Sequence, residues 1–255
     1  MKPSLSEIPR GNTSPGVNRA VIEYLASLDG DLSGQSLLDV PCGNGEFLDA
    51  VKRFFPRCKT IGADIVKPTG FEHEFYRFDA EKGSGLETVE NCKVATCISG
   101  VMEFDNTLRF LQTVGSVSDS GAKLIVTNDN LTTVRDRLLY FLFGRFRQYK
   151  TTPKHSRATW KIIHLNNLIH LLRDAGYAVG DIRYVIAGWT EWFWLPLAVP
   201  MYALQMIYFM TNEPDVSLAE KRKFLPFASM FARHYFLICE KKTESADDTN
   251  PEGTK

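Results

Sequence analysis

The turn at residues 41–45 is the part of this sequence best suited to hold a small ligand. A short apolar run that contains Asp39 leads into a turn with two glycines, Gly43 and Gly45, and a helical pattern begins directly afterwards. Glycine lets the backbone approach a ligand closely, and the free N–H groups at the start of a helix bind anionic groups. The turn therefore predicts a site for a phosphate or a carboxylate.

An acidic residue ends the next apolar segment. Asp64 lies in residues 60–65, which have the pattern of a strand, about 20 residues beyond the turn, where nucleotide-binding proteins carry the acid that accepts hydrogen bonds from ribose. This position suits any adenosine-type cofactor. The dinucleotide fingerprint also needs a small residue three positions after the second glycine, and Leu48 stands there instead. The pattern therefore disfavours NAD as the cofactor.

Four motifs occur in order, each at the expected end of a strand. They are Asp-x-x-Cys-Gly-x-Gly-x-Phe from Asp39, Gly-x-Asp ending at Asp64, Phe78-Asp79-Ala80, and Ile98-Ser99-Gly100-Val101-Met102-Glu103. With this set the chain resembles the class I S-adenosylmethionine-dependent methyltransferases over roughly residues 17–185, with the last strand in addition. Pro41 stands where that family often has a glycine, and it still permits the turn because Gly43 and Gly45 are kept.

The resemblance implies a role for each motif in holding S-adenosylmethionine. Asp39 and the backbone of residues 42–45 would hold the methionine part, and Asp64 would accept from the ribose. Asp79 and the N–H of Ala80 would meet the adenine, while Ser99 and Gly100 would line the cleft beneath the sulfonium. The expected cofactor-binding residues are Asp39, Pro41, Cys42, Gly43, Asn44, Gly45, Asp64, Ile65, Asp79, Ala80, Ser99 and Gly100.

Two of these residues have purely structural alternatives. Asp79 is placed to cap a helix before Glu81, and Ser99 is placed to cap the end of a strand. The catalytic residue stays unassigned. A hydroxyl acceptor would benefit from a general base, for which the candidates are Glu103, Asp129, His155 and His164. His164 also precedes a helix and is placed to cap it. No spacing of histidines and carboxylates predicts a metal site.

Strands and helices alternate along most of the chain. The strands are expected at residues 36–40, 60–65, 76–80, 93–99, 122–128, 182–187 and 234–240. Such alternation is typical of an α/β, doubly wound, mostly parallel sheet. The resemblance implies a seven-stranded Rossmann-like sheet with an antiparallel final strand and an apolar helical insertion. Residues 1–15 read as a flexible arm, 16–242 as the methyltransferase domain, and 243–255 as a disordered tail.

Two segments of the domain are unlike the rest. Residues 131–161 predict a basic helical cap, because eight basic residues and one acid lie between positions 135 and 161, with aromatic residues among them. This stretch is either a solvated loop or a site for an anionic acceptor or for lipid headgroups. Aromatic residues mixed with arginine also bind nucleic acid, but 30 basic and 30 acidic residues give zero net charge, so no nucleic acid is expected.

The second segment is the apolar insertion at residues 189–231. Its first part, 189–210, is long enough to cross a membrane. In the family, however, the strands on either side pair within one sheet, so a single crossing would separate them. Glu191, Pro196 and Pro200 also favour a broken element. The alternatives that remain are a re-entrant hairpin, an interfacial helix in peripheral contact with a membrane, a lid, or the surface of a homodimer.

The predicted function is transfer of a methyl group from S-adenosylmethionine. Residues 130–146, with the helix expected at 165–177, are similar to methyltransferases of bacterial surface-glycan and lipid pathways, which implies a hydroxyl of a glycan or a lipid-linked molecule as acceptor. The alternatives are a Rossmann enzyme that uses NAD or a nucleotide sugar, and a non-catalytic module that binds S-adenosylmethionine.

Five dispersed cysteines and an N-terminus without an apolar stretch predict a cytoplasmic location, with membrane association as an alternative.

Overall fold

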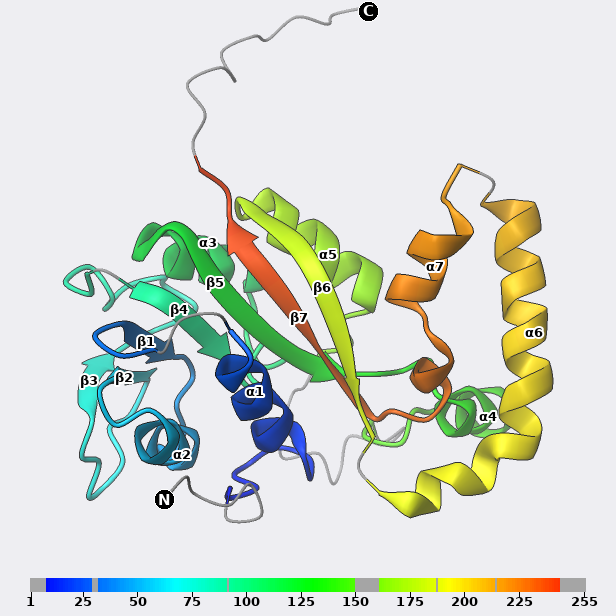
Figure 1. The fold of residues 1–255 in the computed structure, drawn as a ribbon, viewed down its shortest axis with the longest axis horizontal. Coiled ribbons are helices and arrows are strands. Elements are labelled where there is room, and N and C mark those ends of the chain that lie inside the picture. The colour runs from blue at the N-terminus through cyan, green and yellow to red at the C-terminus, as the bar shows by residue number, and fades with distance from the viewer. Residues whose placement is uncertain are drawn as a thin grey trace, which may run out of the picture.

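A seven-stranded sheet forms the centre of the protein (Figure 1). The computed structural model describes residues 8–28, 32–90, 92–149, 161–186, 188–213 and 215–243. The strands are β1 (Ser36–Asp39), β2 (Lys59–Asp64), β3 (Glu74–Arg77), β4 (Cys92–Cys97), β5 (Ser118–Asp129), β6 (Tyr177–Val185) and β7 (His234–Lys241), in the order β3-β2-β1-β4-β5-β7-β6. Neighbours from β3 to β5 are parallel, and β7 runs antiparallel to β5 and β6. The predicted sheet is confirmed.

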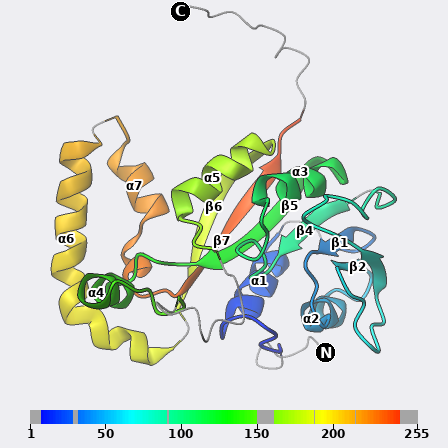
Figure 2. The same ribbon diagram turned by 180° about the vertical axis from the view of Figure 1, so that it is seen from behind.

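Helices cover both faces of this sheet. One face carries α1 (Val17–Ala26) and α2 (Glu46–Phe54), and the other carries α3 (Thr107–Ser116) and α5 (Leu165–Asp174) (Figures 1 and 2). All four residues of β1 are buried, and so are the first six of β7. Strands buried on both faces consist of continuous apolar runs, which is why residues 36–40 and 93–99 were recognisable in the sequence.

The boundaries of several strands differ from the prediction. β5 begins at Ser118 and β6 begins at Tyr177, both several residues earlier than expected, whereas β3 ends at Arg77. β6 follows α5 after a turn at Gly176, whose φ of 86° is easily reached only by glycine. Gly121 lies within β5 at a φ of 72°, so the chain continues in the same strand on both sides of this glycine.

Residues 8–15 are more ordered than the composition suggested. Residues 8–15, which were assigned to a flexible arm, pack against the fold: Asn18 donates to the carbonyl oxygens of Pro9 and Arg10, and Arg10 donates to that of Thr13. Thr13 is buried. The buried Asn18 side chain thereby holds this segment against the start of α1. Residues 1–7 and 244–255 lie outside the described residues.

The apolar insertion leaves the sheet after β6 and returns at β7. It contains η3 (Trp189–Trp194), α6 (Leu195–Asn212), α7 (Leu218–Phe224) and η4 (Phe227–Met230). Its helical segment 189–212 bends sharply where it turns up along the edge of the molecule in Figure 1. α6 contains Pro200, which removes a backbone hydrogen bond and accounts for the bend. This agrees with the broken element expected there.

Helix α4 (Val134–Phe143) follows β5 and packs on the insertion. Asn130, just after β5, connects the end of this strand to the insertion by hydrogen bonds. Its side-chain amide donates to the carbonyl oxygens of Ser229 and Ala232, each at 2.7 Å, and its Oδ1 accepts from the Thr132 N–H. Asn130 is buried, so each of these groups would lack a partner without it. The basic helical cap is described only to Tyr149 and from Lys161.

We predict that Asn130→Ala lowers the free energy of unfolding by about 2–4 kcal/mol, because it leaves buried backbone groups unpaired. Chemical denaturation followed by circular dichroism measures this loss. Asn167→Ala, at an exposed position of α5, is the matched control and should change the value by less than about 0.5 kcal/mol. Equal effects of the two substitutions would show that Asn130 does not hold the insertion to the sheet.

Candidate active site

The carboxyl ends of the parallel strands meet at one edge of the sheet, and the predicted site residues lie along it. The chain proceeds from β1 outwards to β3 and then returns to β4 on the other side of β1. Ligands of doubly wound sheets bind at such a switch point, outside the carboxyl ends of the strands. Asp39 ends β1, Asp64 ends β2, and Ser99 follows β4. The fold thus brings together three residues that are far apart in the sequence.

Asp39 is a buried carboxyl group at this switch point. It pairs in register with Thr96 of β4, whose hydroxyl donates to Asp39 Oδ1 at 2.7 Å. Burial raises the pKa of Asp39 to about 7; the Thr96 hydrogen bond opposes this rise, and the negative charge of Asp64 adds to it. The carboxylate is therefore poorly stabilised by the protein alone. A cation bound beside it would stabilise its ionised form.

The turn at residues 41–45 is held between the two neighbouring strands. The Val40 N–H donates to Thr96 in β4, and the Cys42 N–H donates to Ala63 in β2. Gly43 and Gly45 have φ values of 50° and 85°, so both need the freedom of glycine. A Cβ on Gly43 would have only Asn12 nearby, at 3.7 Å, whereas a Cβ on Gly45 would come within 2.8 Å of the Phe71 ring.

The two glycines therefore differ in what they face. Beside Gly45 the space is filled by Phe71, which also lies against Gly62 of β2. Beside Gly43 the space is open towards the N-terminal segment. A ligand-facing role for Gly43 agrees with this geometry, whereas Gly45 begins α2 and makes room for an internal ring. Pro41, preceded by a cis peptide bond, lies against Gly100, where a Cβ would come within 2.2 Å of the proline ring.

Asp64 is oriented by two backbone donors. Its Oδ2 accepts from the Gly43 N–H at 2.9 Å, and its Oδ1 accepts from the Ile65 N–H at 2.7 Å. The carboxylate thus links the turn after β1 to the end of β2. Beside it, the apolar side chains of Ile65 and Val66 are 57 % and 68 % exposed. An ordered acid next to an exposed apolar surface can hold a sugar and the flat base attached to it.

The carboxylate of Asp79 already accepts hydrogen bonds from the turn that follows it. Its Oδ1 accepts from the N–H groups of Glu81 and Lys82, and its Oδ2 pairs with the Lys82 ammonium at 3.1 Å. The Lys82 side chain, the main cause, and these backbone donors hold the pKa of Asp79 below its ordinary value. The geometry resembles the capping alternative, although a turn and not a helix follows. Asp79 lies near Asp64 because the Phe78 N–H donates to the Asp64 carbonyl.

Ser99 lies on the opposite side of the turn from Asp64. It has a φ of 54°, which is rare for a residue with a side chain. Its N–H donates to Thr127 Oγ1 at 2.7 Å, and its hydroxyl lies 2.5 Å from that of Thr13. Ser99 therefore joins three parts of the chain: β4, β5 and the N-terminal segment. Strained backbone of this kind is concentrated at functional sites.

A small cavity of about 60 Å³ lies between Asp39, the turn and residues 11–13. Its remaining lining residues include Asn18, Phe47 and Ile98. Pockets for whole cofactors have volumes of roughly 300–1,000 Å³. The cavity can therefore enclose only one end of such a molecule, and the remainder would lie over the open surface beside Asp64. Gly11, Asn12 and Thr13 line this cavity, which the sequence did not predict. Their segment is rich in glycine and asparagine, a composition typical of a flexible arm.

The four candidates for a general base lie in different surroundings. Glu103 and His164 are exposed, and the His164 ring caps α5 by accepting from the Asn166 N–H, as its position before a helix suggested. His155 lies outside the described residues. Asp129, in contrast, is buried at the carboxyl end of β5. Its Oδ1 accepts from Gln148 and lies 3.2 Å from His234 Nδ1, and its Oδ2 has no hydrogen-bond partner in the described structure.

Asp129 belongs to a cluster of buried titratable side chains that also contains Arg147 and His234. Burial raises the pKa of Asp129 to about 6, and the positive charge of Arg147 opposes that rise. Burial lowers the pKa of His234 to about 4, so this ring is neutral at pH 7. Of the three candidates that the structure describes, Asp129 is the one whose environment best suits proton acceptance near neutral pH. His234 was given no role from the sequence, since only the pairing of β5 with β7 brings it to Asp129.

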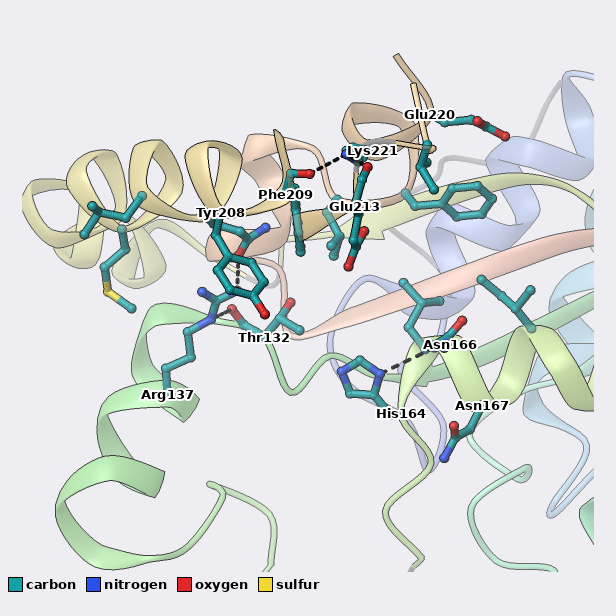
Figure 3. Close-up of a pocket in the computed structure, with 18 of the residues that line it drawn as sticks. Thr132, Arg137, His164, Asn166, Asn167, Tyr208, Phe209, Glu213, Glu220 and Lys221 are labelled. Carbon is teal, nitrogen blue, oxygen red and sulfur yellow. Dashed lines mark hydrogen bonds between the residues drawn. The ribbon is translucent and has the colours of Figure 1, made fainter. Parts of the chain in front are cut away.

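A large groove, shown in Figure 3, lies near Asp129. Its volume is about 1180 Å³, and it lies between α5, α6 and α7. Apolar side chains, among them Leu204, Phe209 and Phe224, form much of its wall. Thr132 and His164 line both this groove and a cavity of about 10 Å³ next to Asp129. The groove therefore leads from the insertion towards the carboxyl edge of the sheet.

Two cationic side chains that line this groove, those of Arg137 and Lys221, form hydrogen bonds within the protein. Arg137 donates to the Thr132 carbonyl at 2.8 Å and to Gln205, as the dashed lines in Figure 3 indicate. Lys221 donates to the carbonyl oxygens of Phe209 and Glu213 at the end of α6. Within the described residues, no group of three or more histidine, cysteine, aspartate or glutamate side chains is arranged to hold a metal ion. All five cysteines are buried and free.

Solved structures share this arrangement of strands and helices. A crystal structure from Archaeoglobus fulgidus, described as an S-adenosylmethionine-dependent methyltransferase, is 15% identical with a TM-score of 0.52, covering 88% of this chain and 93% of that one. Another from Mesorhizobium loti, with the same description, is 12% identical with a TM-score of 0.52, covering 86% and 96%. The chain has the methyltransferase fold.

The same fold also carries other chemistry. The [4+2]-cyclase SpnF is 19% identical to this chain, with a TM-score of 0.53, and the match covers 89% of this chain and 80% of the cyclase. No protein-family model matches the sequence, and no curated protein matches it. At these identities the comparisons establish the methyltransferase fold and leave the reaction to be argued from the site.

We predict that Asp39 gives the protein's stability a dependence on pH. Between its ordinary pKa of 3.8 and about 7, the folded protein keeps this proton longer than the unfolded chain does, so the free energy of unfolding falls as pH rises through that range. Asp39→Asn lacks this titration. The stability of the variant relative to the natural protein should therefore increase between about pH 4.5 and about pH 8. Thermal unfolding across this range measures the difference, and a difference that does not change with pH would contradict the raised pKa.

Proposed function

We propose that this protein binds S-adenosylmethionine and transfers its methyl group. The observation that carries this proposal is the pair formed by Asp39 and Asp64. Asp39 is a buried acid that has no cationic partner among the described residues. Asp64 lies at the end of β2, where its carboxylate accepts a hydrogen bond from the backbone N–H of Gly43. The two acids end neighbouring parallel strands at the switch point of the sheet. A ligand with a cationic end and a ribose matches both.

The residues of the site fit this cofactor. The cavity beside Asp39 suits the methionine end, whose ammonium group would stabilise the carboxylate. Asp64 would accept hydrogen bonds from the ribose hydroxyls, and the exposed apolar surface of Ile65 and Val66 suits a face of the adenine. The predicted contact between Asp79 and the adenine amino group stays a prediction, since the Asp79 carboxylate already accepts two backbone hydrogen bonds.

The chain's own part in the reaction is mainly to orient the reactants and exclude water. When bound, S-adenosylmethionine supplies a methyl group made electrophilic by its sulfonium. Residues 11–13 close over the turn and Ser99 lies against them, so the site is shielded on that side. Holding two reactants in register is worth up to about 7–11 kcal/mol of a reaction barrier. For a hydroxyl acceptor, Asp129 would take up the proton.

The alternatives have less support. An enzyme that uses NAD or a nucleotide sugar has no need of a buried acid such as Asp39 beside the turn, and Leu48, which replaces the third glycine, is buried. A module that only binds the cofactor would have no use for the large groove next to Asp129. The acid pair therefore favours S-adenosylmethionine, and the groove favours turnover.

We predict that S-adenosylhomocysteine binds this protein in isothermal titration calorimetry and that NAD does not. Asp64→Asn should weaken the binding about 10- to 100-fold, because it removes the charge that strengthens two hydrogen bonds to the ribose. Asparagine is preferred to alanine here because its oxygen can still accept from the Gly43 N–H. The matched control is Asp215→Asn, at an exposed position in the insertion, which should leave the affinity unchanged.

Binding of NAD in place of S-adenosylhomocysteine would overturn the proposed cofactor. Equal affinity of the Asp64→Asn variant and the natural protein would remove Asp64 from the site. Circular dichroism of the variant excludes loss of folding as the reason for weaker binding.

For the acceptor, we propose a hydroxyl of a lipid-linked molecule, including a lipid-linked glycan. The groove between α5, α6 and α7 has an apolar wall from the insertion and a polar end at Thr132 and His164. A molecule with a long apolar part and a polar head matches both ends. α6, which forms part of this wall, is itself exposed and apolar on its outer side, so an amphiphile can reach the groove along it.

We predict that methyl label from S-adenosylmethionine enters lipid-like products. The protein is incubated with S-adenosylmethionine labelled in its methyl group and with a total lipid extract, and the label is then partitioned between organic solvent and water. Label should collect in the organic phase in an amount that depends on the protein, and Asp64→Asn should reduce it. Label found only in the aqueous phase, after addition of a water-soluble extract, would contradict a lipid-linked acceptor.

A further inference from the structure

One end of the molecule exposes a large apolar surface, which we call the apolar end. It consists of the exposed side chains of Tyr140, Phe141, Leu142 and Phe143 in α4, Trp189, Trp192 and Phe193 in η3, and Leu195, Leu197 and Val199 in α6. Phe141, Trp189 and Phe193 are 84 %, 83 % and 80 % exposed. Large contiguous apolar patches on proteins are sites of interaction with other molecules or with membranes.

The helical segment at this end has the composition of a buried element but is not buried. Residues 192–212 contain no charged side chain, and only Ala198 and Gln205 of α6 are buried. A helix that is apolar all round normally lies inside a protein or a membrane. In the described chain, residues 189–212 are also the one helical segment long and apolar enough to cross a membrane by length and composition. Nothing in the described part of the chain covers this segment, so its exposed apolar surface is available to another molecule.

The fold excludes a simple crossing. Val185 at the end of β6 pairs with His234 at the start of β7, so the insertion leaves and re-enters the sheet at the same place. A single span would separate two strands that are hydrogen-bonded to each other. The segment also bends, and α4 lies in the angle between its two limbs in both views (Figures 1 and 2). This shape suits a surface that rests on a bilayer better than one that passes through it.

The charges around the apolar end favour an anionic surface. The two nearby acids, Asp136 and Glu191, are buried against Arg147, with their oxygens 2.7 and 3.6 Å from its guanidinium nitrogens. Arg135 of α4 is exposed. The acids are thus turned inwards and neutralised, and the exposed charge beside the apolar side chains is positive. Tryptophan and other aromatic side chains at such a position are typical of the interface between lipid and water.

We infer that the apolar end docks on an anionic lipid bilayer, with the aromatic side chains of α4 and η3 inserted among the headgroups. Binding of this kind grows with the apolar area inserted and with attraction to anionic lipid. It does not depend on the proposed methyl transfer, since the apolar end is separate from the Asp39 cavity.

Tryptophan fluorescence reports on this docking directly, because three of the four tryptophans lie in η3. The full chain is mixed with vesicles of phosphatidylcholine alone or with phosphatidylglycerol added, and binding is measured by flotation. The natural protein should float with the anionic vesicles, its emission should shift to shorter wavelength, and brominated lipid should quench it. The triple substitution Phe141→Ser, Phe143→Ser and Phe193→Ser keeps the tryptophans and should weaken binding on the order of ten-fold or more.

The control is Ile162→Ser, at an exposed apolar residue outside both the apolar end and the groove, and this variant should float as the natural protein does. Calorimetry with S-adenosylhomocysteine on each variant separates this test from that of the cofactor. No flotation of the natural protein with either kind of vesicle would overturn the proposal. A dimer in light scattering that the triple substitution dissociates, without any vesicle binding, would overturn it in favour of a second copy of the chain. Equal binding to neutral vesicles would overturn the preference for anionic lipid.

Discussion

The structure of the candidate site depends on one buried carboxyl group. Asp39 lies at the switch point of a parallel sheet, where the described residues supply one hydroxyl donor, from Thr96, and no positive charge. Burying an ionised carboxylate without a cation is unfavourable, and a protein gains nothing in stability from such a residue. A ligand that brings the missing charge explains its presence. The turn, the Asp64 carboxylate and the N-terminal segment are all arranged around this group.

The insertion places a second constraint on the molecule. Its two ends are fixed side by side by the pairing of β6 with β7. Two of its charged residues, Glu191 and Lys221, turn inwards to partners in the protein. Its apolar residues remain on the outside. Asn130 and the buried Asp129 cluster join this unusual surface to the carboxyl edge of the sheet. The segment after β5 thus connects the groove of the insertion to the carboxyl edge of the sheet.

Much of the fold was predictable because the signals are local. Apolar runs such as residues 36–40 mark buried strands, and the acids Asp39 and Asp64 followed from their places at strand ends. The environments of these residues were not predictable, because they come from pairs distant in the sequence. The Thr96 partner of Asp39 and the neutral His234 beside Asp129 depend on strand register, and the Thr13 contact of Ser99 depends on how the N-terminal segment packs. Gly45 was taken to face a ligand because its sequence neighbours do not reveal Phe71.

The most direct test of the account is the affinity for S-adenosylhomocysteine as a function of pH, measured by calorimetry on the natural protein and on Asp39→Asn. If the buried carboxylate receives the cationic end of the ligand, affinity should rise with pH and level off above about 7, where Asp39 of the free protein is ionised. The variant should bind more weakly and show no such rise. An affinity that is the same across this range, or a rise that persists without Asp39, would contradict the central claim.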